Sequence, residues 1–178
     1  MSLFSRFFKQ TNDNEQKKEA AQQQLQTIVH RTISFSYYMA RDFADLDNCN
    51  DDDPAPHMLF FSLFPRLVAF YTLQASTFLK TTSLIHYVNL DFEHAFDDIP
   101  HSLYSTAQQD LIETYDRFVD HYNSAPPRAS SAFDTWQYRC CRDITNTCML
   151  PDPVTATLEL FSSASGFIEF LNKENPNA

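Results

Sequence analysis

The chain has 178 residues, 43% of them apolar, with seventeen Phe, eight Tyr and a net charge of −10. Its single glycine argues against β-sandwiches and barrels, against Gly-rich phosphate loops and against the Gly-x-Ser-x-Gly elbow of many hydrolases. The negative charge would repel nucleic acid and favours a basic protein as partner.

The first half of the sequence predicts a long helix over residues 12–46, followed by an acidic loop that contains Pro54 and Pro56. Apolar residues recur there every three or four positions. They are Leu25, Ile28, Thr32, Phe35, Met39, Phe43 and Leu46. We treat residues 1–24 as a polar, flexible N-terminal segment.

The next segment, residues 58–87, is apolar on more than one face and predicts a central helix. Pro65 should kink or divide it, and Thr81 to Ser83 marks a further break. Residues 102–122 then predict an amphipathic helix, with Ser105 and Gln108 as a capping box.

Two more helices complete the pattern. Ser130 or Ser131 can cap a helix that bears Phe133 and Trp136, and Asp152-Pro153 is a strong start signal for the last helix. Together these elements predict an all-α, single-domain bundle of five to six helices over residues 25–172, with a flexible tail at 173–178.

The last helix carries two apolar stripes, whereas a surface helix needs only one. We therefore expect it to lie centrally in the bundle. The alternative is that one face binds a partner or forms a homodimer. The residues proposed for such an oligomer or helix-packing face are Leu160, Ala164, Phe167, Leu171, Ser162 and Gly166.

Metal chemistry has one weak candidate set, formed by Asp91, His94, Asp98 and His101. His94 and Asp98 are spaced to share a helix face, but no second ligand pair completes a bundle-type site. The acidic loop from Asp45 onward fails the calcium-loop pattern, because its sixth position is Asn50 and its twelfth is Pro56. We expect no cofactor and no catalytic residue.

Four cysteines without a C-x-x-C pair predict buried thiols in a reducing compartment, and hence a cytoplasmic location. No signal peptide or membrane-spanning segment is expected. Residues 3–9, with Leu3, Phe4, Phe7 and Phe8 beside Arg6 and Lys9, suggest a membrane-surface helix less well than a flexible tail or a segment docked on the domain.

The functional hypothesis is based on the acidic stretches of the chain. Their candidate partner-binding residues are Asp47, Asp51, Asp52, Asp53, Asp110, Glu113, Asp116 and Asp120. They favour a non-enzymatic module that binds a basic protein, in the manner of an inhibitor or immunity protein that neutralises a basic toxin or nuclease. The alternatives are a bundle that binds an apolar small molecule and a metal-assisted enzyme at the His94 and Asp98 region.

Overall fold

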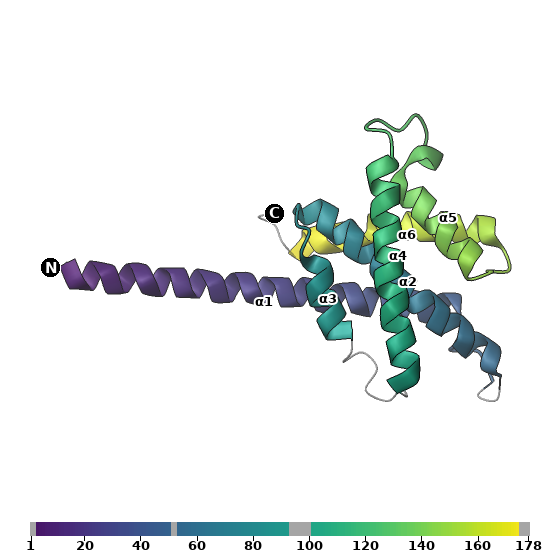
Figure 1. The fold of residues 1–178 in the computed structure, drawn as a ribbon, viewed down its shortest axis with the longest axis horizontal. Helices are drawn as coiled ribbons and strands as arrows, with labels where there is room; N and C mark the ends of the chain where they lie inside the picture. Colours follow the sequence, from purple (N-terminus) through teal and green to yellow (C-terminus); the bar gives the residue numbers. More distant parts are fainter. Residues whose placement is uncertain (1–2, 51–52, 93–100, 175–178) are drawn as a thin grey trace.

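The computed structural model describes residues 3–50, 53–92 and 101–174, and the side chains of residues 18–50, 53–92 and 105–171. Within these ranges the chain is an all-α bundle without strands (Figure 1). Its helices are α1 (Leu3–Phe43), α2 (Pro54–Leu79), α3 (Leu84–Phe92), α4 (His101–Ser124), the short 3₁₀ helix η2 (Ala132–Asp134), α5 (Trp136–Thr147) and α6 (Pro153–Glu174).

Helix α2 is the central element and packs against α1, α3, α4, α5 and α6. From Leu63 to Ser76 every residue except Arg66 is buried, as expected for a segment that is apolar on more than one face. By length and composition α2 would also be long enough to cross a membrane, but 72% of its most apolar window is buried inside the protein. A core helix of a bundle accounts for that pattern.

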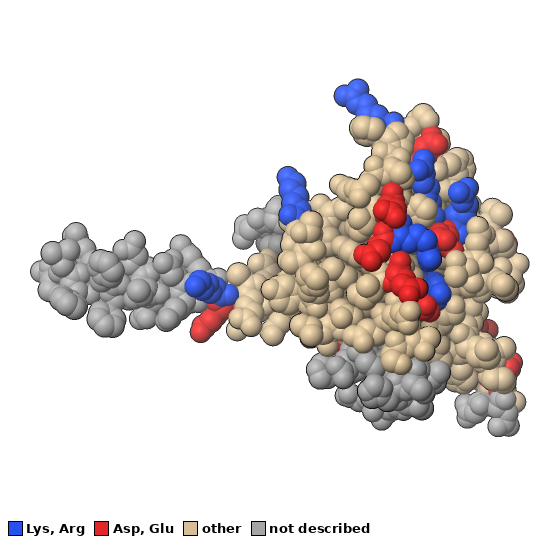
Figure 2. Space-filling view, viewed as in Figure 1, with Lys and Arg blue, Asp and Glu red and all other residues tan. Residues whose placement is uncertain are grey.

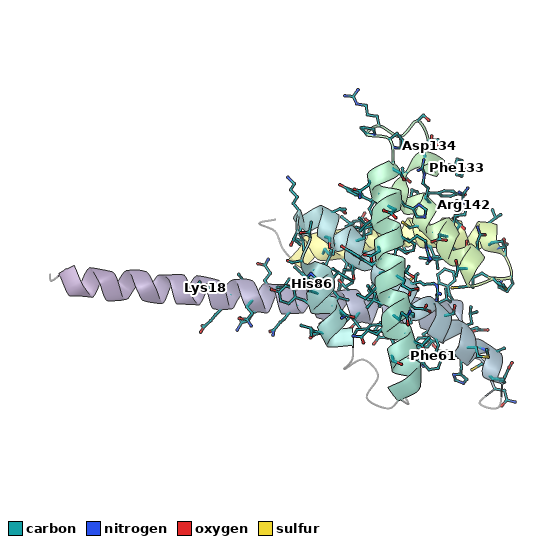
Figure 3. All side chains as sticks on the ribbon, in the orientation of Figure 1. Lys18, Phe61, His86, Phe133, Asp134 and Arg142 are labelled. Atoms are coloured by element: carbon teal, nitrogen blue, oxygen red, sulfur yellow. The ribbon has the colours of Figure 1, made fainter. Side chains whose placement is uncertain are left out.

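Helix α1 starts nine residues earlier than the predicted residue 12, at Leu3, and its first half projects away from the body (Figure 1). Strong helix formers occupy this stretch, including Ala20, Ala21 and three consecutive glutamines. Residues 18–24 are all exposed, and Figure 3 shows Lys18 well outside the bundle. Packing begins at the half-buried Leu25.

The break after α2 falls where the sequence predicts it. Lys80 adopts a left-handed conformation with φ of 54°, and its N–H bonds to the Ser76 carbonyl, so α2 ends there and α3 begins at Leu84. Of the two outcomes expected at Pro65, a kink or a division, the division is wrong, since α2 continues across it, and the kink stays a prediction. Asp45 and Met149 form two other left-handed corners, with φ of 52° and 53°.

The later helix starts are partly as predicted. Asp152 caps α6 by accepting the Thr155 N–H at 3.1 Å. The Thr155 hydroxyl also donates to Asp152 at 2.7 Å, and this bond, with the backbone bond, lowers the pKa of the Asp152 carboxyl. The capping box at Ser105 is wrong because α4 already begins at His101. Gln108 instead donates to Asn89 Oδ1 of α3 at 3.1 Å. Helix α5 is capped by Thr135 rather than by either serine.

The expectation that α6 is central is also wrong. One stripe is buried, but the other is only partly covered: Val154 is 67% and Leu158 49% exposed, whereas Phe161 and Ile168 are half-buried against the core. The buried stripe helps to form an aromatic core, in which Tyr71 lies 4.9 Å from both Phe35 and Phe167 between ring centroids. The Tyr71 hydroxyl is 2.5 Å from Ser163 Oγ, which ties α6 to the central helix.

Candidate functional site

The acidic loop is built largely from carboxylates that have structural partners. Asp47 accepts a hydrogen bond from Arg41 Nε at 2.6 Å, and this bond, with the charge of Asp47, raises the pKa of Arg41. Asp45 accepts from Asn48 at 2.7 Å, and Asp53 caps α2 by accepting the Ala55 N–H at 2.9 Å. Asp51 and Asp52 lie outside the described residues. Much of the loop's charge is therefore engaged within the turn between α1 and α2.

The acidic face expected on α4 is mixed in charge. Asp110 is 3.1 Å from Arg66 of α2, and Arg117 donates to Asp143 of α5 at 2.6 Å. Figure 2 shows acidic and basic side chains side by side on this part of the surface. Glu113 accepts from Gln109 at 2.7 Å, while Asp116 and Asp120 are exposed. The ion pairs join α4 to its neighbours, so Asp110 is not a free charge for a partner.

The proposed face on α6 separates into two sides. Leu160, Ala164, Phe167 and Leu171 are buried in the core of this chain, where they pack against its own helices. They are therefore not available to a second copy. Ser162 and Gly166 are exposed, and nothing lies within 4 Å of a Cβ built on Gly166. Of the residues first considered, only Ser162 and Gly166 therefore lie on the outward side of α6.

The candidate metal set cannot be assembled from the described residues. Asp91 is exposed on α3, whereas His94 and Asp98 lie outside the described residues and the side chain of His101 is likewise not described. In the part of the chain whose side chains are described, no three His, Cys, Asp or Glu residues come together.

The thiols are poorly suited to nucleophilic chemistry. Cys140, Cys141 and Cys148 are buried and free, and burial raises the pKa of each thiol. Only the thiolate is a strong nucleophile, so a raised pKa suppresses reactivity near neutral pH. Cys148 Sγ instead lies 3.4 Å from Ser62 Oγ, a polar contact between α2 and the end of α5.

A groove between α1 and α3 brings together residues of a different kind. It has a volume of about 440 Å³ and is lined by His30, Ile33, Ser34, Tyr37, Tyr38, Phe64 and Asp91. A second hollow of about 460 Å³ shares Tyr38 and is lined by Met39, Arg41, Asp42 and Asp47. We call these two hollows, which share Tyr38 in their linings, the tyrosine groove. Its lining combines exposed aromatic surface with carboxylates.

Tyr37 and Tyr38 differ in how they are held. The Tyr37 ring packs edge-on against Phe60 and Phe64 of α2, with centroids 5.4 and 5.8 Å apart, and also against Tyr38. Tyr37 is 36% exposed and Tyr38 67% exposed. Tyr37 is therefore fixed by the core, and Tyr38 presents most of its ring to the surroundings.

Asp42 and Asp91 supply charge at the two ends of the groove. Both are exposed, and neither has a hydrogen-bond or ion-pair partner among the described side chains, in contrast to Asp47. Sequence reasoning did not single out the tyrosines. The available signal was that Tyr37 and Tyr38 are large aromatic residues off the apolar stripe of α1, where Phe35 and Met39 mark the core side.

Comparisons of this chain with protein-family models, with curated proteins and with solved structures return no match. Its function therefore has to be inferred from its own surface.

Proposed function

We propose that this chain is a non-enzymatic, acidic protein-binding module that holds a basic segment of another protein in the tyrosine groove. The observation that carries the proposal is Tyr38, which is 67% exposed beside the carboxylates of Asp42 and Asp91, neither of which has a partner among the described side chains. Tyrosine is enriched among the residues that dominate binding energy at protein interfaces. Its ring buries apolar area while its hydroxyl can bond to the partner.

The groove is pre-organised for binding. Contacts of Tyr37 with Phe60 and Phe64 fix one wall before any partner arrives. Ordering a side chain at an interface costs about 0.5–1.5 kcal/mol, and a ring that is already fixed avoids this cost. Tyr38 has only two side-chain torsions, so its ordering is also inexpensive.

Charge determines which partner fits. Two exposed carboxylates that have no partner in the described part of the chain, on a protein of net charge −10, attract a segment that carries Lys or Arg. Complementary charge mainly increases the association rate and rejects acidic proteins, while the buried aromatic contact slows dissociation. An arginine could also stack on the exposed tyrosine ring.

An inhibitor or immunity protein that neutralises a basic toxin or nuclease is one use of such a groove. Neutralisation requires rapid capture of a cationic surface, which the charge distribution favours. The free thiols of Cys140, Cys141 and Cys148 suit the reducing cytoplasm, where such an inhibitor would protect its host.

The test is affinity capture at low and high salt with the wild-type chain and two variants. Tyr38→Ala removes the exposed ring of the groove, and Tyr122→Ala removes a tyrosine of 45% exposure on α4, far along the sequence from the groove. We expect wild type and Tyr122→Ala to retain a basic protein at low salt and release it at high salt. Tyr38→Ala should retain at least about tenfold less.

Quantitative binding then decides the proposal. The captured protein is titrated into each variant, and the association rate is followed as salt rises. A partner that binds Tyr38→Ala as tightly as wild type would show that the groove is not the site. An association rate that is independent of salt would show that Asp42 and Asp91 do not attract the partner by their charge.

A further inference from the structure

We propose that the tyrosine groove selects arginine over lysine, and that one arginine side chain of the partner lies on the Tyr38 ring while it donates to the Asp42 carboxylate. The inference rests on the proposed function, because it assumes that the groove holds a basic segment. It adds the chemical identity of the side chain that the groove recognises.

The first step is the relative position of the ring and the carboxylate. Tyr38 and Asp42 are four residues apart on α1, both are exposed, and both line the hollow of about 460 Å³. Side chains at this spacing share one helix face, with Cβ atoms about 5–6 Å apart. A planar guanidinium that rests on the ring can therefore direct an N–H group at the carboxylate one turn further on.

The second step is that a face of the Tyr38 ring is open. Its ring centroid lies 5.8 Å from that of Tyr37, and the two ring planes are 85° apart. In this edge-to-face arrangement Tyr37 covers at most one face of Tyr38, which remains 67% exposed. Tyr37 is itself held against Phe60 and Phe64. The groove thus offers an open aromatic face beside a fixed wall, which is a surface on which a guanidinium stacks.

The third step is the charge balance of this hollow. Arg41 also lines it and would repel a guest cation if its own charge were not compensated. Arg41 donates to Asp47 at 2.6 Å, whereas Asp42 has no partner among the described side chains. One arginine and two aspartates give the lining a net charge of −1. The hollow is therefore matched to one guest cation.

The fourth step is that the chain holds one of its own arginines in the same way. The guanidinium carbon of Arg117 lies 5.9 Å from the centroid of the Phe118 ring, and Arg117 Nε donates to Asp143 at 2.6 Å. One guanidinium thus contacts an aromatic ring and a carboxylate together. The arrangement proposed for the guest is the same combination, with Tyr38 as the ring and Asp42 as the carboxylate.

A lysine would gain less from this surface. Its ammonium group is compact and strongly hydrated, so it has no flat face to lay on the ring and no fork of parallel N–H groups for the carboxylate. A simple ion pair with an exposed carboxylate contributes little in water. We therefore expect the preference for arginine to depend chiefly on the ring of Tyr38.

The experiment compares two fluorescently labelled peptides of equal charge, hexa-arginine and hexa-lysine, which are titrated with the full chain at low salt and followed by fluorescence anisotropy. Wild type should bind hexa-arginine at least about fivefold more tightly than hexa-lysine. Tyr38→Phe keeps the ring and should keep this preference. Tyr38→Leu keeps an apolar side chain without a ring, and its preference should fall below about twofold.

Matched controls separate the groove from the rest of the acidic surface. Tyr122→Leu removes a tyrosine of 45% exposure on α4 and should leave the preference as in wild type. Asp42→Asn and Asp116→Asn each remove one exposed negative charge, so they have the same net charge. Asp42→Asn should weaken hexa-arginine by at least about twofold more than Asp116→Asn does. Circular dichroism checks that each variant is folded.

The possible results distinguish this inference from the proposed function. Equal affinity of wild type for the two peptides, with both weakened by Tyr38→Leu, would overturn the arginine preference and leave the proposed function standing. A preference that persists in Tyr38→Leu would place the arginine on another ring and would also overturn the inference.

Two further results reach the proposed function. If neither peptide is weakened by Tyr38→Leu or by Asp42→Asn, the groove does not bind basic segments, and the proposed function fails together with the inference. If neither peptide binds wild type at all, the inference is overturned, and the proposed function stands only where capture of a basic protein still depends on Tyr38.

Discussion

The Nη1 atom of Arg66 lies 3.1 Å from the Oδ2 atom of Asp110, which links the central helix α2 to α4. The Arg66 side chain is only 12% exposed and also donates to the Ser62 carbonyl at 2.5 Å. A charge so close to the core needs a partner, since an unpaired buried ion is costly.

The first prediction concerns this ion pair. Asp110→Ala should lower the free energy of unfolding by about 2 kcal/mol, below the full cost of breaking a buried pair because Asp110 is one-third exposed. Asp116→Ala, on the exposed side of the same helix, should change it by less than about 0.5 kcal/mol. Urea denaturation measures both, and equal losses would show that Arg66 finds water or another partner.

The second prediction is a loss of stability in alkali. Burial raises the pKa of the Cys140, Cys141 and Cys148 thiols, so the folded chain keeps protons that the unfolded chain loses. This contribution is fully present below about pH 8.5 and is lost as the pH rises toward the folded pKa. Each thiol then lowers the free energy of unfolding by up to about 1.4 kcal/mol per pH unit.

Urea denaturation between neutral pH and pH 10 tests this slope. Cys141→Ala should be destabilised at neutral pH but should lose less further stability on going to high pH. A wild-type stability that does not change across this range would mean that the thiols ionise as easily in the folded chain as in the unfolded one.

The third prediction separates two carboxylates of the acidic loop. Asp53→Ala removes the N-cap of α2 and should cost about 1 kcal/mol of stability. Asp47→Asn removes an exposed ion pair with Arg41 and should leave the thermal midpoint unchanged. Thermal unfolding followed by circular dichroism compares them, and a larger loss in Asp47→Asn would reverse the assignment.

The fourth prediction concerns the only glycine. Gly166 lies inside α6, and a Cβ added there meets nothing within 4 Å. Gly166→Ala should therefore raise the free energy of unfolding by about 0.5–1 kcal/mol, because alanine restricts the unfolded chain and favours helix. Calorimetry measures the gain. Destabilisation would indicate that the backbone at Gly166 is held in a form that alanine disfavours.

Local signals in the sequence were sufficient for much of the fold. Asp152 followed by Pro153 identified the start of α6, and the apolar residues around Leu67 identified α2 as the central helix. These features depend on capping chemistry and periodicity, which act over a few residues. The two apolar stripes of α6 led to the wrong prediction that this helix is central. Periodicity shows that a face is apolar but not whether another helix covers it.

The candidate site was beyond this kind of reasoning. Asp91 and Tyr38 are 53 positions apart and meet only because α3 packs against α1. Arg66 and Asp110 likewise meet through the packing of α2 on α4, so the sequence alone counted Asp110 as a surface charge. The net charge of the chain predicts that a basic partner is favoured. It does not predict where a partner binds, because the fold decides which carboxylates form ion pairs with basic residues of the same chain.

The left-handed corners at Asp45, Lys80 and Met149 have a consequence for the evolution of this chain. A residue with a Cβ pays about 1 kcal/mol to adopt that conformation, and glycine does not. The chain places its one glycine in a helix and side chains at three turns, which is the reverse of the least strained arrangement. Single substitutions at these three turns would therefore raise the free energy of unfolding. A chain stabilised in this way would tolerate destabilising changes in the tyrosine groove without unfolding.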